Sequence, residues 1–226
     1  NKGYENLCRI ISEANDKNFY RTMTVDFELL EKYTEGIICS SACIAGYLSQ
    51  AVVKKKTNLA VKAAKKFKQI YGDNFYIELQ PMVIEERKTD IQKYVIEKLM
   101  TVAEEVGVKT ILTSDSRFTR KEDFDSYLMM HRLGKIGTEK GEGFTIEHIE
   151  KAYKERYMHS EKEICIKFAK MHGFYPQEQL DAMDEIYEKI NVDLDFSGSI
   201  PECDDYEDNE KALIKICQKK LKETGR

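Results

Sequence analysis

Apolar residues recur at helical spacing over several stretches of the chain. The first stretch runs from Tyr4 to Asn15, where the apolar positions fall on one side of a helix. A short helix is predicted over residues 26–33, with Asp26 at its start as the residue that caps the first backbone N–H groups. The remaining helices are predicted over residues 44–53, 57–71, 90–106, 121–133, 145–155, 160–172, 176–190 and 209–223.

Three further apolar segments are short and rich in β-branched, small or aromatic residues, which predicts strands. They are residues 37–43 (IICSSAC), 74–81 (NFYIELQP) and 108–115 (VKTILTSD). Each is too apolar to face water on both sides, and helices alternate with them along the chain. This alternation is typical of a parallel sheet with helices packed outside it. The sequence therefore predicts an α/β fold. Three strands do not close a barrel, so we expect either a small open sheet or further strands upstream of the start NKGYENL, and we favour the second.

The composition is compatible with a well-packed core and gives no general argument for nucleic-acid binding. Of the 226 residues, 42% are hydrophobic and 34% are charged, and the formal net charge is −4. A basic run at residues 54–68 has a predicted apolar face, which consists of Val61, Ala64, Phe67 and Ile70. We interpret its lysines as the solvated side of a helix rather than as a DNA-binding stripe.

The six cysteines do not form a metal-binding or disulfide pattern. Cys39 and Cys43 are four residues apart, but no second Cys/His pair at zinc-finger spacing accompanies them. We therefore expect reduced, buried thiols in a cytoplasmic protein. No apolar run approaches the roughly 20 residues that a membrane span needs, and the sequence has no signal-peptide pattern.

Polar side chains follow each predicted strand. Parallel strands present their carboxyl ends at one edge of a sheet, so these side chains are expected to lie close together. A thiolate and a carboxylate can bind a divalent metal, but two ligands are too few for a tight site and all four histidines lie in the helical second half. In the alternative interpretation Asp115 is a turn or helix-capping residue and Cys43 a small buried side chain. The full set is Ser40, Ser41, Cys43, Glu78, Gln80, Thr113, Ser114, Asp115 and Arg117.

Successive blocks of the sequence resemble the PHP domain of bacterial C-family replicative DNA polymerases, the DNA polymerase III alpha subunits. The blocks are GYENLCRIISEAN, GIICSSACIAGYLS, YGDNFYIELQ and VGVKTILTSDSRF, followed by SYLMMHRLGKIGT, RYMHSEKEICIKF and EIYEKINVDLDF. The resemblance implies part of a distorted, TIM-like parallel β/α barrel followed by a helical C-terminal region. Residues 1–135 would form the partial barrel, residues 136–191 its helical continuation, and residues 192–226 a linker and helix leading toward the polymerase core.

The resemblance also assigns vestigial metal ligands. The family's Ser-Gly-Cys block matches residues 41–43 and its Asp-x-His block matches residues 115–117, so Cys43 and Asp115 carry over. Arg117 stands where the family has His, and a guanidinium has no lone pair to give a metal. We predict that Arg117 pairs with Asp115 or with backbone at an inactive former metal site.

Three other strand-end residues, Ser41, Glu78 and Thr113, are further candidates for this site. The family's first His-x-His motif and several more ligands would precede residue 1.

The function implied is that of a fragment of a DNA-directed DNA polymerase. The parent would extend a DNA primer with dNTPs, using Mg²⁺ held by carboxylates beyond residue 226. The fragment itself is predicted to be inactive, to bind no cofactor, and to stabilise the polymerase or dock a proofreading exonuclease subunit.

Two alternatives remain at the level of sequence. A metal-dependent PHP phosphoesterase or exonuclease would require a His-rich upstream half and a His in place of Arg117. A helical interaction module would have no parallel strands converging near Cys43 and Asp115.

Overall fold

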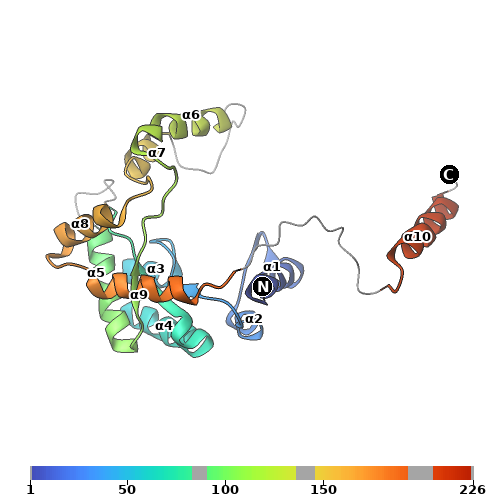
Figure 1. Cartoon of the computed structure of the whole chain (residues 1–226), viewed down its shortest axis with the longest axis horizontal. Helices are drawn as coiled ribbons and strands as arrows, with labels where there is room; N and C mark the ends of the chain where they lie inside the picture. The colour runs from blue at the N-terminus through green and yellow to red at the C-terminus, as the bar shows by residue number, and fades with distance from the viewer. Residues whose placement is uncertain (1, 83–90, 136–145, 193–205, 225–226) are drawn as a thin grey trace. The chain divides into compact units, whose positions relative to one another are not determined.

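The computed structural model describes residues 2–82, 91–135, 146–192 and 206–224 (Figure 1). The chain divides into two units, Asn1–Asn191 and Val192–Arg226. Most of the glycine-rich segment 135–144 and of the acidic segment 192–210 lies outside the described residues. Among the described helices, none is both long and apolar enough to cross a membrane.

The centre of the first unit is a three-stranded parallel sheet in the order β3-β4-β5. Its strands are β3 (Cys39–Ser40), β4 (Phe75–Leu79) and β5 (Thr110–Leu112). The predicted parallel α/β arrangement is thus confirmed among the described residues, and a purely helical module is excluded. The two outer strands are shorter than predicted. The last backbone hydrogen bonds to β4 are donated by the Ser41 N–H to the Tyr76 carbonyl at 3.0 Å and by the Thr113 N–H to the Leu79 carbonyl at 3.2 Å, and turns follow at Ala42 and Asp115, which have left-handed φ.

One face of the sheet is covered by three helices, α3 (Tyr47–Val53), α4 (Thr57–Tyr71) and α5 (Ile91–Val106). Alternate residues of β4 point into this layer and are at most 2% exposed, where they meet apolar side chains from the helices. The main contributors to this core are Leu48, Val52, Ala64, Phe75, Ile77, Leu79, Val95, Leu99, Val102, Leu112 and Phe168.

The helices of this layer follow their predicted patterns. The apolar face of α4 packs inward, with Val61 and Ala64 buried and Phe67 and Ile70 partly buried. Gly107 ends α5 with a φ of 69°, a left-handed conformation that glycine adopts without strain.

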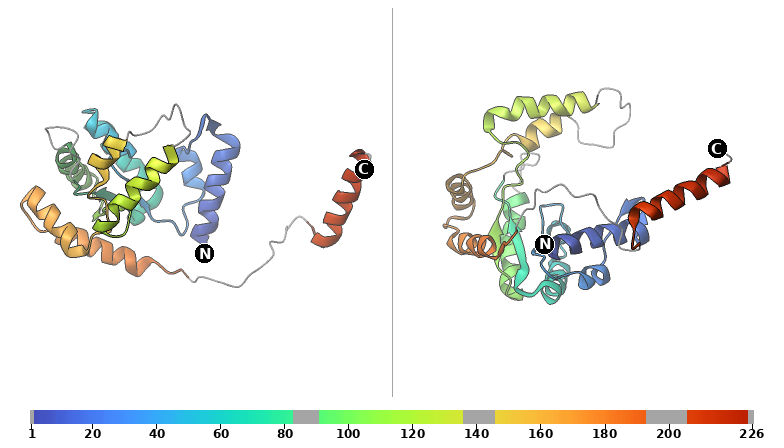
Figure 2. Two further views of the ribbon diagram at one scale, coloured as in Figure 1. Left: turned by 90° about the horizontal axis from the view of Figure 1, so that it is seen from above. Right: turned by 45° about the vertical axis from the view of Figure 1, so that its right-hand side comes forward.

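The opposite face of the sheet is covered by α9 (Gln177–Lys189), shown in orange on the other side of the sheet from α3 and α4 (Figures 1 and 2). Tyr76 and Ile111 pack there against Ala182. Polar contacts reinforce this packing, since the Tyr76 hydroxyl donates to Glu185 at 2.9 Å. Because of this second layer β4 is buried on both faces, which explains why its sequence is apolar at nearly every position.

The amino-terminal part of the first unit is made of α1 (Lys2–Lys17) and α2 (Phe27–Lys32). The predicted cap is confirmed, because the Asp26 carboxylate accepts from the Leu29 N–H at 2.8 Å. Between the helices lies a hairpin, β1 (Phe19–Tyr20) and β2 (Thr22–Met23), that was not predicted from the sequence. Strands of two residues are too short to show a period-two pattern.

The remaining helices are α6 (Phe124–Lys135), α7 (Ile146–Tyr153) and α8 (Glu161–His172), with short 3₁₀ turns η1 (Gly72–Asn74) and η2 (Lys121–Asp123). α6 and α7 share a small apolar cluster of their own. α8 begins at a capping box, in which Ser160 and Glu163 satisfy each other's backbone N–H groups. The described part of the second unit contains α10 (Asn209–Thr224), which has no buried residue.

The expectation that the thiols are buried is wrong for two cysteines. Cys165 is 1% exposed, but Cys8 and Cys217 are exposed. α1 buries Asn6, Ile10 and Ala14, which recur every four residues, so Cys8 lies off this face. All cysteines in the described part of the chain are free thiols.

Candidate functional site

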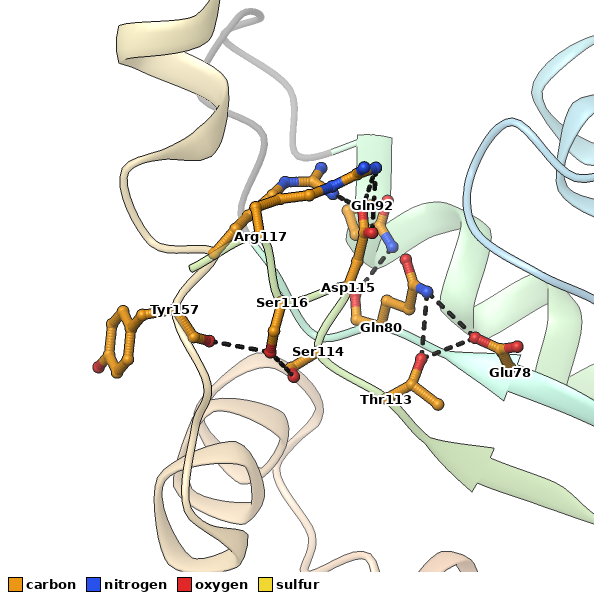
Figure 3. A network of polar contacts seen from close by, with 10 residues as sticks. Glu78, Gln80, Gln92, Thr113, Ser114, Asp115, Ser116, Arg117 and Tyr157 are labelled. Carbon is orange, nitrogen blue, oxygen red and sulfur yellow. Dashed lines mark hydrogen bonds and ion pairs between the residues drawn. The ribbon is translucent and has the colours of Figure 1, made fainter. Parts of the chain in front are cut away.

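The carboxyl ends of the three strands are joined by a network of polar side chains around Glu78. Figure 3 shows its contacts with Gln80 and Thr113. The Glu78 carboxylate accepts from the Ser40 hydroxyl on β3, from the Thr113 hydroxyl beyond β5 at 2.7 Å, and from the Gln80 amide at 3.1 Å. The same Gln80 amide nitrogen lies 3.1 Å from the Thr113 hydroxyl. The Glu78 carboxylate therefore accepts hydrogen bonds from neutral donors, and these bonds link the ends of the three strands.

The turn after β3 positions Ser41 and Cys43. The Ser41 hydroxyl accepts from the Glu78 N–H at 2.9 Å, and the residue is only 6% exposed, so this hydroxyl is part of the sheet. Ala42 follows with a left-handed φ of 60°. The turn is so tight that a Cβ on Gly46 would lie 2.3 Å from the Ser41 carbonyl oxygen. Cys43 is left partly buried at the strand end.

Asp115 lies in the turn after β5, with a left-handed φ of 43° that Asp tolerates better than most residues. Its side chain is 18% exposed and accepts from two arginines. Arg117 Nη2 lies 3.1 Å from Asp115 Oδ1, so the ion pair predicted from the sequence is confirmed. Arg156 Nη1 donates to Oδ2 of the same carboxylate. This second arginine was not predicted.

A single tyrosine orients both arginines. The guanidinium carbons of Arg156 and Arg117 lie 4.9 Å and 5.6 Å from the centre of the Tyr153 ring, within the range of cation–π attraction. Burial lowers the pKa of Arg156, and a Coulombic interaction with Cys43 opposes this shift.

Arg156 reaches Asp115 because its segment pairs with the chain just after the turn. The Arg117 N–H donates to the Arg156 carbonyl at 2.7 Å, and the Met158 N–H donates to the Phe118 carbonyl at 3.0 Å. The Ser116 hydroxyl adds a 3.2 Å bond to the Tyr157 carbonyl (Figure 3). One bridge between residues about forty positions apart leaves no periodic pattern, so no sequence signal pointed to Arg156.

These side chains, as they are arranged, do not fit a divalent metal. Both oxygens of Asp115 face guanidinium groups, and the Ser41 hydroxyl and the Glu78 carboxylate are engaged in the sheet. Within the described ranges no group of three or more His, Cys, Asp or Glu side chains could hold a metal ion. Two guanidinium charges lie beside the single carboxylate of this turn. The net positive charge there repels a cation.

Two cavities border β5. One, of about 520 Å³, begins beside Thr113 and Ser114 and extends between α8 and α9 toward His159 and Tyr175. The other, of about 720 Å³, lies at the opposite end of the strand, where Lys109 and Glu185 line it. Neither cavity is lined by Cys43 or Asp115.

Comparison with known sequences identifies the class of domain first. Residues 1–82 match the PHP domain family. This matched segment contains β3 and β4, so it is similar to the PHP domain family over two of the three strands of the parallel sheet.

Curated relatives then identify the larger group. The chain is 31% identical over 166 residues to the DNA polymerase III subunit alpha of Borreliella burgdorferi, which covers 74% of this chain and 14% of that protein. It is 36% identical over 132 residues to the same subunit of Aquifex aeolicus, with 58% and 11% covered. For Treponema pallidum the identity is 29% over 199 residues, with 88% and 16% covered.

The resemblance to the DNA polymerase III alpha subunits is thereby confirmed over most of the chain. The chain spans 14%, 11% and 16% of the length of these three relatives.

Proposed function

We propose that this chain is the PHP region of a DNA polymerase III alpha subunit, and that its strand-end cluster performs no chemistry of its own. The sequence relationship supports the first part. The single observation that carries the second part is that both oxygens of Asp115 are engaged by Arg117 and Arg156.

The parent protein would be a DNA-directed DNA polymerase. It would act on DNA and dNTPs through a separate core that holds Mg²⁺ on paired carboxylates. In this proposal residues 1–135 contribute part of a parallel barrel, residues 136–191 continue it with helices, and residues 192–226 lead toward the core. The described module would stabilise the polymerase or present a surface to a proofreading exonuclease subunit.

The strand-end cluster is expected to be inactive because it lacks what the first step of metal-dependent phosphoester hydrolysis requires. Hydrolysis of a phosphoester at a metal centre needs an ion that lowers the pKa of a bound water and neutralises the phosphate. A guanidinium can neutralise charge, but it cannot bind water as a Lewis acid. Arg117 and Arg156 therefore stabilise the Asp115 carboxylate without replacing the reactivity of a metal.

Metal analysis of the purified chain tests this proposal. We expect no stoichiometric Zn²⁺ or Mn²⁺ after dialysis against either ion, and no hydrolysis of a phosphodiester substrate above the buffer rate. A D115N variant should behave identically in both assays, because Asp115 is not a ligand here. Tightly bound ions with phosphoester hydrolysis that D115N abolishes would instead establish the alternative function, a metal-dependent PHP phosphoesterase.

A further inference from the structure

We infer that Arg156 is the side chain that closes the Cys43–Asp115 strand ends to a divalent cation, and that Arg117 alone does not do so. The inference rests on the proposed function, in which this cluster is a former metal site. From the sequence, the loss of the site was expected to follow from the replacement at Arg117 alone.

Burial separates the two arginines. The Arg156 side chain is 12% exposed, whereas that of Arg117 is 45% exposed. Both pair with Asp115, but a half-exposed guanidinium is well hydrated and exchanges its partner at little cost. A buried guanidinium gives up its carboxylate only at a large desolvation cost. Arg156 is therefore the more persistent partner of Asp115.

Arg156 also lies at the carboxylate that an ion would have to use. It donates to Asp115 Oδ2. An ion bound by this carboxylate together with the Cys43 sulfur would have to approach Asp115 where this guanidinium lies. The guanidinium would exclude such an ion both by its volume and by its charge.

The backbone holds Arg156 in place. Its carbonyl accepts from the Arg117 N–H at 2.7 Å, and the pairing continues to Met158 and Phe118. The ring of Tyr153 lies 4.9 Å from its guanidinium carbon. Restoring a histidine at position 117 would consequently leave Asp115 Oδ2 still bound by Arg156.

Cobalt binding distinguishes the two arginines, because Co²⁺ ligated by a thiolate gives a near-ultraviolet charge-transfer absorption. The variants are R117H, R156A and R117H/R156A, with R117H/R156A/C43A as the matched control for the other thiols. We expect no such absorption from the wild type or from R117H. The double variant should show it and should bind Co²⁺ roughly 10- to 100-fold more tightly than R117H, and C43A should remove it.

Each outcome decides a separate point. If the single variant R117H shows the absorption and R117H/C43A does not, Arg156 does not exclude the ion. The proposal that the wild-type site is inactive would still stand. The absorption in the wild type, lost in a C43A variant, would overturn both this inference and the proposed function. A folded double variant without the absorption would overturn the inference only. Far-ultraviolet circular dichroism checks the fold, and R156Q, which keeps most of the side-chain volume without the charge, replaces R156A if that variant is unfolded.

Discussion

The turn at Asp115 combines a left-handed backbone with two guanidiniums of unequal burial, and this inequality has a consequence for stability. A charged pair at low exposure contributes more than one at the surface, because removing one partner leaves the other charge poorly solvated. An exposed pair contributes little, because water and salt screen it. The two arginines should therefore differ in their contribution to folding, although both contact one carboxylate.

We predict that R156A lowers the free energy of unfolding by roughly 1–3 kcal/mol, in the range of hydrogen bonds to charged groups. R117A serves as the matched control and should cost less than about 1 kcal/mol. Urea denaturation of the two variants and the wild type under one buffer condition measures both values. Equal losses, or a larger loss for R117A, would contradict the assignment of Arg156 as the dominant partner.

Cysteine reactivity offers a second prediction at the scale of single residues. Burial raises the pKa of the Cys39 thiol to about 11, whereas Cys8 is exposed. The thiolate is the reactive form, and the rise of the Cys39 pKa from 9.0 to about 11 lowers its thiolate fraction at pH 8 roughly 100-fold. At pH 8 we therefore expect iodoacetamide to modify Cys39 roughly 100-fold more slowly than Cys8, as followed by peptide mass spectrometry of the folded chain. A denatured chain serves as the control for the intrinsic reactivity of the two thiols. Comparable modification rates of Cys39 and Cys8 in the folded chain as well would show that burial does not slow the reaction of Cys39.

At the scale of elements, α9 is attached to the sheet through a carboxylate as well as through apolar packing. Glu185 accepts from Tyr76 at 2.9 Å and pairs with Lys189 at 2.7 Å and with Lys109. The hydrogen bonds from Lys109, Lys189 and Tyr76 lower the pKa of Glu185 from 4.5 to about 2. This carboxylate thus links α9 to β4 and to the residue that precedes β5.

The lowered pKa of Glu185 predicts how acid destabilises this attachment. Because its folded-state pKa lies below its unfolded value, the stabilisation is fully present above about pH 4.5 and is lost as the pH falls toward about 2. We expect E185Q to weaken the dependence of the urea midpoint on pH within this window. Glu13 has a pKa of about 2 for a similar reason, so E185Q should reduce the slope without abolishing it. An unchanged slope in E185Q would contradict the prediction.

The elements also show how much of this fold can be predicted from its sequence. α4 and α5 are long and periodic and end at glycines, so they agree with prediction almost to the residue. The strand lengths were overestimated, because Ala42 and Asp115 adopt left-handed φ values that turn the chain out of the sheet, and nothing in the composition of those segments signals this. The Asp115–Arg117 pair was predictable because the resemblance marks both positions and they are two residues apart. Arg156 was not, since a contact made through tertiary pairing has no local signal.

At the scale of the whole molecule, the two units differ in how they are held together. The apolar clusters of the first unit, among the residues that the structure describes, draw on no residue beyond Ile186. α10 contains no buried residue, and its Leu213 and Leu221 are 61% and 52% exposed. An isolated helix of this length is marginally stable in water. The cooperative core of the chain therefore lies within residues 1–191.

Deletion of residues 192–226 tests this division. We expect the shortened chain to unfold cooperatively with a melting temperature within about 2 °C of the full chain, because a loss of less than about 0.5 kcal/mol shifts the midpoint of a domain of this size by no more than that. Its far-ultraviolet circular dichroism should lose only the contribution of α10. An L99A variant, in which a 2% exposed core residue is truncated, provides the contrasting control and should cost roughly 2–5 kcal/mol. A drop in melting temperature on deletion as large as that of L99A would mean that α10 contributes to the core, and the division at residue 191 would be wrong.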